Sequence, residues 1–289
     1  MPLQLSSSPG RPLTFEADDA VRLHGRWFTP STPARGVVLI VPAMATASAF
    51  YSGFASWLAE NGYATMTFDY RGYGDSATEP MSAVTSDLLR WAHDARDALA
   101  HVHAEAADLP ITWIGHSFGG QALPFADHQV LSAAMNVSSG SGYWRMNSFP
   151  ARLGAPLLWK VVAPATIALY GYYPGAKLRV LDDLPSAVTR QWASWCMHPD
   201  YLLSEFPEAR QSFADVALPL RSLSFTDDKL MSDQSIARLE ALYTGTRLTS
   251  ARFSPAELGV KSIGHHGFFH RSRTELWHRL VLPFLTENS

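Results

Sequence analysis

The ten residues from Ile111 to Gly120, ITWIGHSFGG, constrain the fold of this chain more than any other stretch. A short strand-like run enters a five-residue turn, G-H-S-F-G, and a helix is expected to begin near Gly119. A serine on such a turn, with glycines two residues before and after it, indicates a nucleophile elbow. A Cβ at either glycine would collide with the neighbouring strand or helix, and Ser117 is forced into a strained backbone conformation. The pattern predicts a Ser117 hydroxyl held at the positive end of a helix.

Strand and helix patterns alternate along the rest of the chain. Continuous β-branched runs indicate strands buried on both faces, and apolar residues at helical spacing indicate helices. The expected strands are Leu13–Ala17, Val21–Phe28, Gly36–Val41, Tyr63–Phe68, Ile111–Ile114, Val130–Val137, Leu218–Thr226 and Thr246–Phe253. The expected helices are Phe50–Glu60, Ser86–His103, one after the elbow with Pro124 in its first turns, Asp233–Tyr243 and Arg273–Leu285. The first two strands predict a hairpin, and the others predict an α/β fold with a mostly parallel, doubly wound sheet.

The strand pattern stops between about Ser138 and Ala217, where aromatic residues gather. We expect a helical cap inserted over the carboxyl ends of the strands, which is where such sheets carry their functional groups. The aromatic side chains then form the cap's own core or line a substrate cavity. The candidates for the cavity are Tyr143, Trp144, Trp159 and Trp192. The predicted domains are a core of residues 1–137 and 218–289 and a cap of residues 138–217.

Composition excludes several classes of protein. The net charge of −3 gives no basic surface for nucleic acid. The single cysteine, Cys196, excludes an internal disulfide and suits a reducing compartment. The first twelve residues predict an extended or disordered lead-in and lack the pattern of a signal peptide. The longest apolar runs, near Val37–Ala45 and Val161–Tyr170, are short for a bilayer span and each contains proline. We therefore expect a cytoplasmic protein without a membrane span. The oligomeric state is left open, with a homodimer as one alternative.

A serine nucleophile needs a base, and the base needs a third group that orients it. In this architecture the chain order is serine, acid, histidine. The strand after the cap runs into Asp227 and Asp228, either of which could be the acid. After the last strand the sequence reads I-G-H-H-G-F-F-H, so His265 and His266 are both candidates for the base.

Other site residues follow from position. The backbone N–H groups of Phe118 and of Met44, in the loop V-P-A-M, are expected to form an oxyanion hole. His116 and His266 are further candidates for the pocket wall, with His116 expected to pack or hydrogen-bond beneath the elbow.

A metal site is not expected. Two of the three histidines of the last motif are adjacent on a loop and point apart, and no second cluster supplies ligands. We predict no metal and no cofactor, and we assign the Cys196 thiol to packing.

Several motifs in one order carry a resemblance. They are V-P-A-M with F-Y-S-G-F-A-S-W-L-A-E-N-G, F-D-Y-R-G-Y-G-D-S, W-I-G-H-S-F-G-G-Q, G-S-G-Y-W, G-Y-Y-P-G, W-C-M-H-P-D-Y, F-T-D-D and I-G-H-H-G-F-F-H. With them the chain resembles the α/β-hydrolase superfamily over nearly its whole length, and more narrowly a bacterial group of serine α/β hydrolases with few characterised members. The resemblance implies a sheet of about eight strands, a cap, and the triad Ser117, Asp228 and His265.

The resemblance also implies an activity. We expect hydrolysis of a carboxylic ester through an acyl-enzyme, with a small-molecule ester and water as partners and with apolar or aryl groups favoured by the aromatic cap. Thioesterase, amidase and acyltransferase activities use the same triad. A catalytically silent ligand-binding homologue is the alternative from another class.

Overall fold

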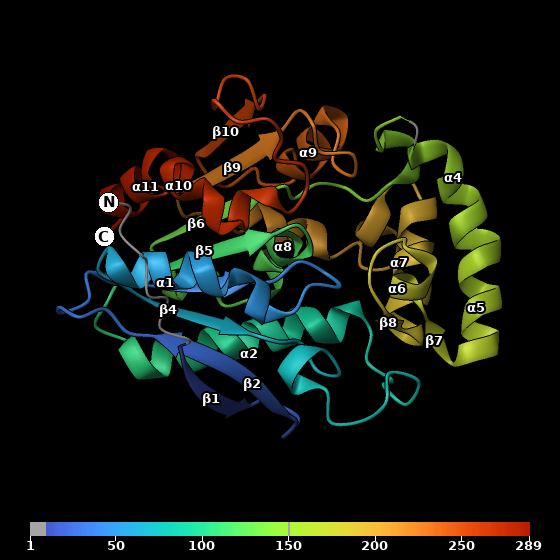
Figure 1. Ribbon diagram of the computed structural model, residues 1–289, viewed down its shortest axis with the longest axis horizontal. Helices are drawn as coiled ribbons and strands as arrows, with labels where there is room; N and C mark the ends of the chain where they lie inside the picture. The colour runs from blue at the N-terminus through green and yellow to red at the C-terminus, as the bar shows by residue number, and fades with distance from the viewer. Residues whose placement is uncertain (1–9, 150) are drawn as a thin grey trace.

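The computed structural model describes residues 10–149 and 151–289, which are built around one eight-stranded sheet (Figure 1). Its strands are β1 (Arg11–Glu16), β2 (Arg22–Phe28), β3 (Gly36–Val41), β4 (Tyr63–Phe68), β5 (Ile111–His116), β6 (Ala133–Val137), β9 (Leu220–Phe225) and β10 (Leu248–Phe253). They lie in the order β1-β2-β4-β3-β5-β6-β9-β10. Strand β2 pairs antiparallel with β1 and β4, and the other pairings are parallel. The predicted mostly parallel sheet of about eight strands is confirmed.

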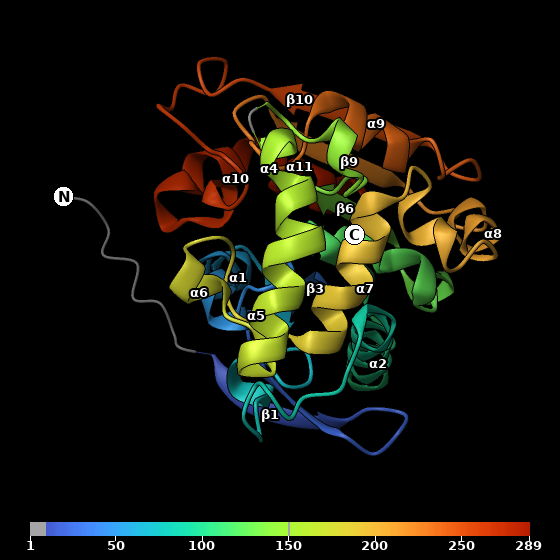
Figure 2. The same cartoon turned by 90° about the vertical axis from the view of Figure 1, so that its right-hand side faces the viewer.

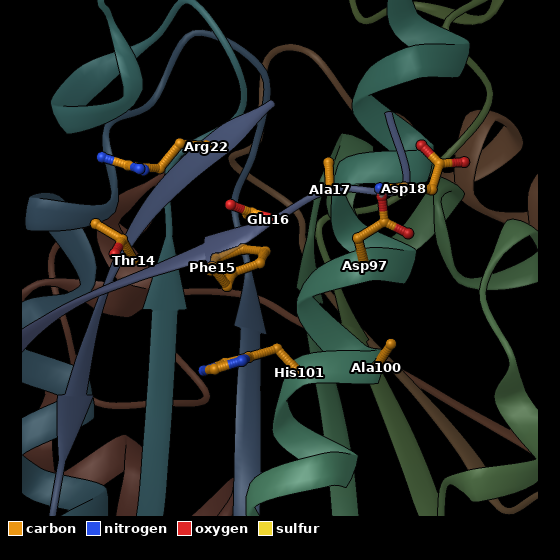
Figure 3. Close-up of a pocket in the computed structure, with 9 residues that line it drawn as sticks. All are labelled: Thr14, Phe15, Glu16, Ala17, Asp18, Arg22, Asp97, Ala100 and His101. Atoms are coloured by element: carbon orange, nitrogen blue, oxygen red, sulfur yellow. Dashed lines mark hydrogen bonds between the residues drawn. The ribbon is translucent and has the colours of Figure 1, made fainter. Parts of the chain in front are cut away.

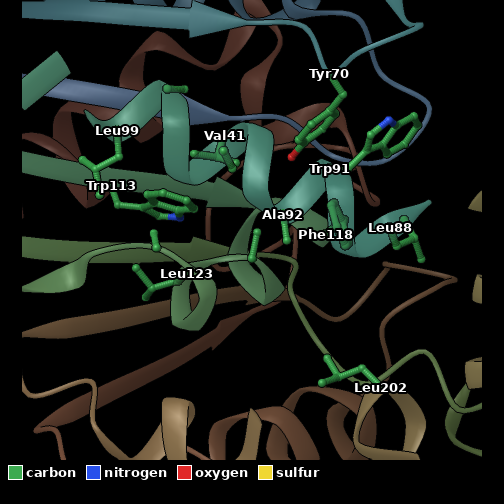
Figure 4. Close-up of a cluster of buried hydrophobic side chains, with 14 of the residues drawn as sticks. Val41, Tyr70, Leu88, Trp91, Ala92, Leu99, Trp113, Phe118, Leu123 and Leu202 are labelled. Atoms are coloured by element: carbon green, nitrogen blue, oxygen red, sulfur yellow. The ribbon is translucent and has the colours of Figure 1, made fainter. Parts of the chain in front are cut away.

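The two faces of the sheet belong to two hydrophobic clusters, because successive side chains of a strand point to opposite sides. Strand β3 shows this alternation: Val37, Leu39 and Val41 belong to one cluster, and Val38 and Ile40 to the other. The second cluster contains α1 (Ser52–Glu60), α10 (Thr274–Leu280) and α11 (Leu282–Glu287). The first contains α2 (Leu88–Ala106) and the short α3 (Phe118–Gln121), as Figure 4 shows.

Some elements are shorter than their sequence patterns suggest. The expected helix after the elbow is only α3, and a 3-10 turn, Leu123–Phe125, follows it with Pro124 near its start. The expected closing helix is divided between α10 and α11, with Pro283 at the start of α11. A proline removes one backbone hydrogen bond and clashes with the preceding turn, so it ends a regular helix. Of the predicted lead-in, residues 1–9 lie outside the described residues, and Arg11 and Pro12 already belong to β1.

Between β6 and β9, the described residues add no strand to the eight-stranded sheet. It forms α4 (Ala151–Leu157), a π-helical turn (Leu158–Val162), α5 (Ala163–Tyr170), β7 (Tyr172–Tyr173), α6 (Gly175–Leu178), β8 (Leu184–Pro185), α7 (Ser186–Met197) and α8 (Ala209–Ala214). Strands β7 and β8 pair with each other, a small sheet that the sequence did not predict. Figures 1 and 2 show α4, α5 and α7 on one side of the molecule, with α4 and α5 outermost. The division into a core and a cap domain stays a prediction.

Helices α4 and α5 run on through the π-helical turn as one 20-residue helix, Ala151–Tyr170, with a mean hydropathy of 1.4. By length and composition alone this helix could cross a membrane, and only 22% of its most apolar 18-residue window is buried inside the molecule. The sequence analysis considered the apolar runs near Val37–Ala45 and Val161–Tyr170, and the helix that contains the second run is longer than that run. The absence of a membrane span stays a prediction. Lys160 interrupts the apolar run but not the helix.

Candidate active site

The elbow at Ser117 has the geometry that its glycines predict. Ser117 follows β5 with φ of +51°, a strained left-handed value for a residue with a side chain. A Cβ on Gly115 would lie 2.5 Å from the carbonyl of Gly119, and a Cβ on Gly119 would overlap the carbonyl oxygen of Val41. The Ser117 N–H donates to the carbonyl of Val137 at 2.9 Å, which ties the turn to β6.

A second pair of residues comes from the loops after β9 and β10. The His265 Nδ1 lies 2.7 Å from the Asp228 Oδ2, and the other carboxyl oxygen accepts the N–H groups of Leu230 and Met231 at 2.8 and 3.1 Å. Burial alone raises the pKa of Asp228, but the hydrogen bonds and charge of His265 and the two N–H groups outweigh it and hold the pKa below its usual value. An ionised carboxylate only accepts, so the His265 Nδ1 carries the proton and its Nε2 is free to accept one.

Asp227 has a different role in the structure. Its Oδ2 accepts the N–H of Ile263 at 2.8 Å, which ties the end of β9 to the loop that carries His265. The structure therefore brings Asp228, and not Asp227, to His265.

Ser117 and His265 share a cavity of about 550 Å³ with Met44 and Phe118. The rest of its wall is Gln121, Gly142, Asn147, Ala151, Gly154, Ala155, Leu158, Trp159, Val180, Leu181, Trp192, Cys196, Tyr201, Leu230, Met231 and His266. No hydrogen bond between the Ser117 hydroxyl and His265 is found in the described part of the chain, and such bonds often tighten only when substrate binds. Among the described residues, no Asp, Glu, Lys or Arg lines this cavity.

Only part of the predicted pocket wall lines this cavity. Trp159, Trp192 and His266 line it, whereas His116, Tyr143 and Trp144 do not. The sequence analysis missed a stretch of α4 and the first residue of the π-helical turn that do so. These four residues follow the i, i+3, i+4, i+7 spacing of one helix face, which is the signal that could have found them. They are Ala151, Gly154, Ala155 and Leu158.

Buried Cys196 also lines the cavity, where burial raises the pKa of its thiol well above the usual value. The thiol therefore stays protonated at neutral pH, and a protonated thiol is a weak nucleophile.

The backbone of the V-P-A-M loop reaches the Ser117 cavity at Met44. The Ala43 N–H donates to the Tyr51 hydroxyl at 2.9 Å, so it has its partner. Met44, the next residue, lines the cavity together with Phe118. The N–H groups of Met44 and Phe118 are thus the candidate oxyanion donors, and their backbone positions depend on the buried Tyr51 and on the elbow.

His116 lies beneath the elbow, fully buried, and joins two loops. Its Nε2 is 2.9 Å from the carbonyl oxygen of His265, and its Nδ1 is 2.7 Å from the Tyr51 hydroxyl. A carbonyl only accepts, so Nε2 carries the proton, and Tyr51 then donates to Nδ1. Burial, with the nearby charges of His265 and His266, lowers the pKa of His116 well below its usual value. Neutral His116, with Tyr51, therefore links the V-P-A-M loop to the backbone of His265.

The other two histidines of the last motif make separate contacts. The His266 Nε2 lies 3.3 Å from the Thr46 hydroxyl, and the His270 Nδ1 lies 2.9 Å from the Ser272 hydroxyl. Across residues 10–149 and 151–289, no group of three or more His, Cys, Asp or Glu side chains is placed to hold a metal ion.

A second hollow, of about 560 Å³, lies between β1 and α2 (Figure 3). Phe15 stacks on His101 with ring centres 5.3 Å apart, and Asp97 accepts the N–H of Asp18 at 3.0 Å. No residue of the Ser117 cavity lines it, so it is a separate surface feature to which we assign no chemistry.

Part of the sequence matches a known protein family and known proteins. A family model described as serine aminopeptidase, S33, matches residues 32–170. The uncharacterised protein YfhR of Salmonella typhi is 30% identical over 138 residues, which is 45% of this chain and 45% of that protein. The chain thus matches less than half the length of this curated relative.

Solved structures match over almost the whole chain. A soluble variant of monoglyceride lipase from Saccharomyces cerevisiae, in complex with a substrate analog, has a TM-score of 0.69 and 13% identity, covering 100% of this chain and 98% of the other. A highly thermostable carboxyl esterase from Bacillus coagulans, in complex with glycerol, has a TM-score of 0.63 and 15% identity, covering 97% and 99%. At these identities the likeness concerns the fold alone.

Proposed function

This chain has the α/β-hydrolase fold, and we propose that it is a serine hydrolase that cleaves carboxylic esters through an acyl-enzyme. One observation carries the proposal: Ser117 on its strained elbow shares a cavity with His265. The Nδ1 of His265 is hydrogen-bonded to the buried carboxylate of Asp228. A serine hydroxyl is a weak nucleophile until a base takes its proton, and this arrangement supplies the base and its orienting group.

The steps follow from the roles of these groups. The His265 Nε2 takes the Ser117 proton as the hydroxyl attacks the ester carbonyl, and the Asp228 carboxylate stabilises the imidazolium. The N–H groups of Phe118 and Met44 hold the oxyanion of the tetrahedral intermediate. The imidazolium protonates the leaving alcohol, which departs and leaves an acyl-serine. His265 then takes a proton from water as the water attacks the acyl carbon. The bond between the acyl carbon and the Ser117 oxygen breaks, and His265 returns its proton to Ser117 as the acid leaves.

The cavity wall favours an uncharged substrate. The ammonium group of an aminopeptidase substrate needs a carboxylate partner when it is buried, and the described wall contains no Asp or Glu. A substrate carboxylate would likewise find no Lys or Arg there. This supports a neutral ester over the peptide substrate that the name of the matching family model suggests.

The apolar part of the wall favours an acyl or aryl group of small to medium size. Leu158, Trp159, Val180, Leu181 and Trp192 contribute aliphatic and aromatic surface, and burial of apolar surface stabilises a complex by about 25 cal/mol per Å². Conversion should therefore rise with acyl length until the chain fills the cavity. Activity confined to short polar esters contradicts this assignment.

The test combines a covalent probe with variants. Wild-type protein should be labelled by a fluorophosphonate and should hydrolyse p-nitrophenyl esters, whereas Ser117→Ala should do neither. His265→Ala should be labelled much more slowly. An inert but well-folded wild type contradicts the hydrolase assignment and favours a ligand-binding homologue. Faster turnover of matched acyl thioesters or anilides, or transfer to an added alcohol in place of water, would replace the ester assignment by thioesterase, amidase or acyltransferase activity.

A cytoplasmic location is also part of the proposal, and it rests on the sequence.

A further inference from the structure

Exposed apolar side chains are concentrated on one part of the molecule. Among the described residues, eight of the ten large apolar side chains that are exposed to solvent lie between Phe149 and Val180. They are Phe149, Leu153, Leu157, Val161, Leu169, Tyr170, Leu178 and Val180. Figure 2 looks at this side and shows the helix Ala151–Tyr170 in front of the sheet, with no element between it and the viewer. Contiguous exposed apolar surface of this kind marks an interaction site.

The helix Ala151–Tyr170 has two opposite faces, each made by side chains four residues apart. The inner face is buried and consists of Ala155, Trp159, Ala163 and Ile167. The outer face is exposed and carries Leu153, Leu157, Val161 and Leu169, with exposed fractions of 66, 60, 55 and 73%. A surface helix of a soluble protein normally turns charged and polar side chains to water, so this outer face lacks its expected solvent side.

Basic residues predominate in the sequence around the outer face, and the acids Asp182 and Asp183 follow directly after Leu181. No Asp or Glu occurs between His128 and Leu181, whereas five Lys and Arg do. They are Arg145, Arg152, Lys160, Lys177 and Arg179, and all are exposed. The Arg152 guanidinium lies 5.8 Å from the Phe149 ring, so basic and apolar groups are neighbours on this surface. Basic residues beside Leu and aromatic side chains are typical of helices that lie in a membrane interface.

We propose that the outer face of the helix Ala151–Tyr170 docks, in the plane of the membrane, on an anionic lipid surface. Apolar side chains at 153, 157, 161 and 169 enter the acyl boundary, and the basic side chains reach anionic headgroups with their charged ends. The proposal does not depend on the activity of Ser117.

The inner face determines that the helix lies on the membrane and does not span it. Trp159 and Ile167 are buried against the rest of the molecule, and Ala155 and Leu158 line the cavity. A spanning helix would have to leave these contacts and open the cavity. In-plane docking keeps them, and it places the cavity one helix diameter from the apolar phase, about 10 Å.

Charge also selects a lipid surface over a second copy of this chain. A two-fold contact through the outer face would place two surfaces that both carry the exposed Arg152 and Lys160 against each other, and their like charges repel. Anionic headgroups neutralise them.

The experiment is flotation of the full chain with vesicles of phosphatidylcholine, with and without phosphatidylglycerol. Wild type should float with the anionic vesicles, and salt should weaken binding. Leu157→Gln with Leu169→Gln should lower the partition coefficient about tenfold or more, because both side chains lose their apolar contact. Arg152→Gln with Lys160→Gln should lower it roughly tenfold on anionic vesicles. Val21→Gln, which removes an exposed apolar side chain directly before β2, should bind as wild type does.

Folding and activity are followed separately. None of the substituted side chains lines the cavity, so each variant should keep its melting temperature and its turnover of a soluble ester. Ser117→Ala should bind vesicles as wild type does, which separates this proposal from the proposed function. Four results would overturn it: no flotation, equal flotation with neutral vesicles, resistance to alkaline extraction as expected of a span, or a dimer that the leucine substitutions dissociate.

Discussion

Among single residues, the neighbouring acids Asp227 and Asp228 give the clearest contrast. Asp228→Asn should lower kcat about ten-thousandfold, because an amide in place of the carboxylate favours the wrong tautomer of His265. Asp227→Asn should keep kcat within about tenfold, because the amide oxygen still accepts the N–H of Ile263. Steady-state kinetics of the two variants on one p-nitrophenyl ester measure the difference. Similar losses in both would contradict the assignment of Asp228.

The buried His116 predicts how stability depends on pH. Its pKa in the folded protein lies below the unfolded value of about 6.5, so its contribution is fully present above that pH and is lost as pH falls. The slope is at most about 1.4 kcal/mol per pH unit. His116→Gln should be less stable than wild type at pH values above 6.5, with a smaller loss on acidification. Urea unfolding across this range tests it. His198→Gln, which alters a half-exposed side chain, serves as the control and should keep the wild-type slope.

Sequence patterns could predict Ser117 because the elbow is local: its glycines stand two residues either side of it. The choice of Asp228 over Asp227 came from the resemblance, since it depends on where each side chain points relative to His265, 37 residues after Asp228. The link from Tyr51 through His116 to His265 spans still larger separations and leaves no local signal.

At the scale of elements, buried strands were the most predictable parts. Strands β3 and β4 match their expected bounds, because a strand buried on both faces reads as a continuous apolar run. The helix Ala151–Tyr170 was not predicted as one element. It contains Gly154, Pro156 and Pro164, which normally interrupt helices, and it continues past them through a π-helical turn.

The same helix predicts a shift in substrate preference. Ala155→Leu on the inner face should fill part of the cavity and move the preferred p-nitrophenyl ester to a shorter acyl chain, with kcat/KM for longer esters reduced about tenfold or more. Ala165→Leu, an equal change at an exposed position of the helix, is the matched control and should leave the chain-length profile unchanged. An unchanged profile for Ala155→Leu would show that acyl groups bind elsewhere.

At the scale of the whole molecule, the cavity is lined both by Met44, Ser117 and His265 and by residues of the segment between β6 and β9, so access to it depends on both. Cys196 on α7 reports this access, because its thiol is buried in the cavity wall. The native thiol should react with Ellman's reagent about a hundredfold more slowly than in the unfolded chain. A phosphonate on Ser117 should slow it further, and Ser117→Ala treated in the same way should show no such slowing. Rapid reaction of native protein would mean that the cavity stands open.

The glycines of the elbow have a consequence for how the protein reaches its active state. The backbone of Gly119 lies directly against the carbonyl of Val41, and the Ser117 N–H reaches Val137, so β3, β5 and β6 must all be in register before the turn can close. A partly assembled chain has no means of holding Ser117 in its strained conformation. Recovery of esterase activity during refolding would therefore time the completion of the central sheet, and it should lag behind the recovery of helical signal.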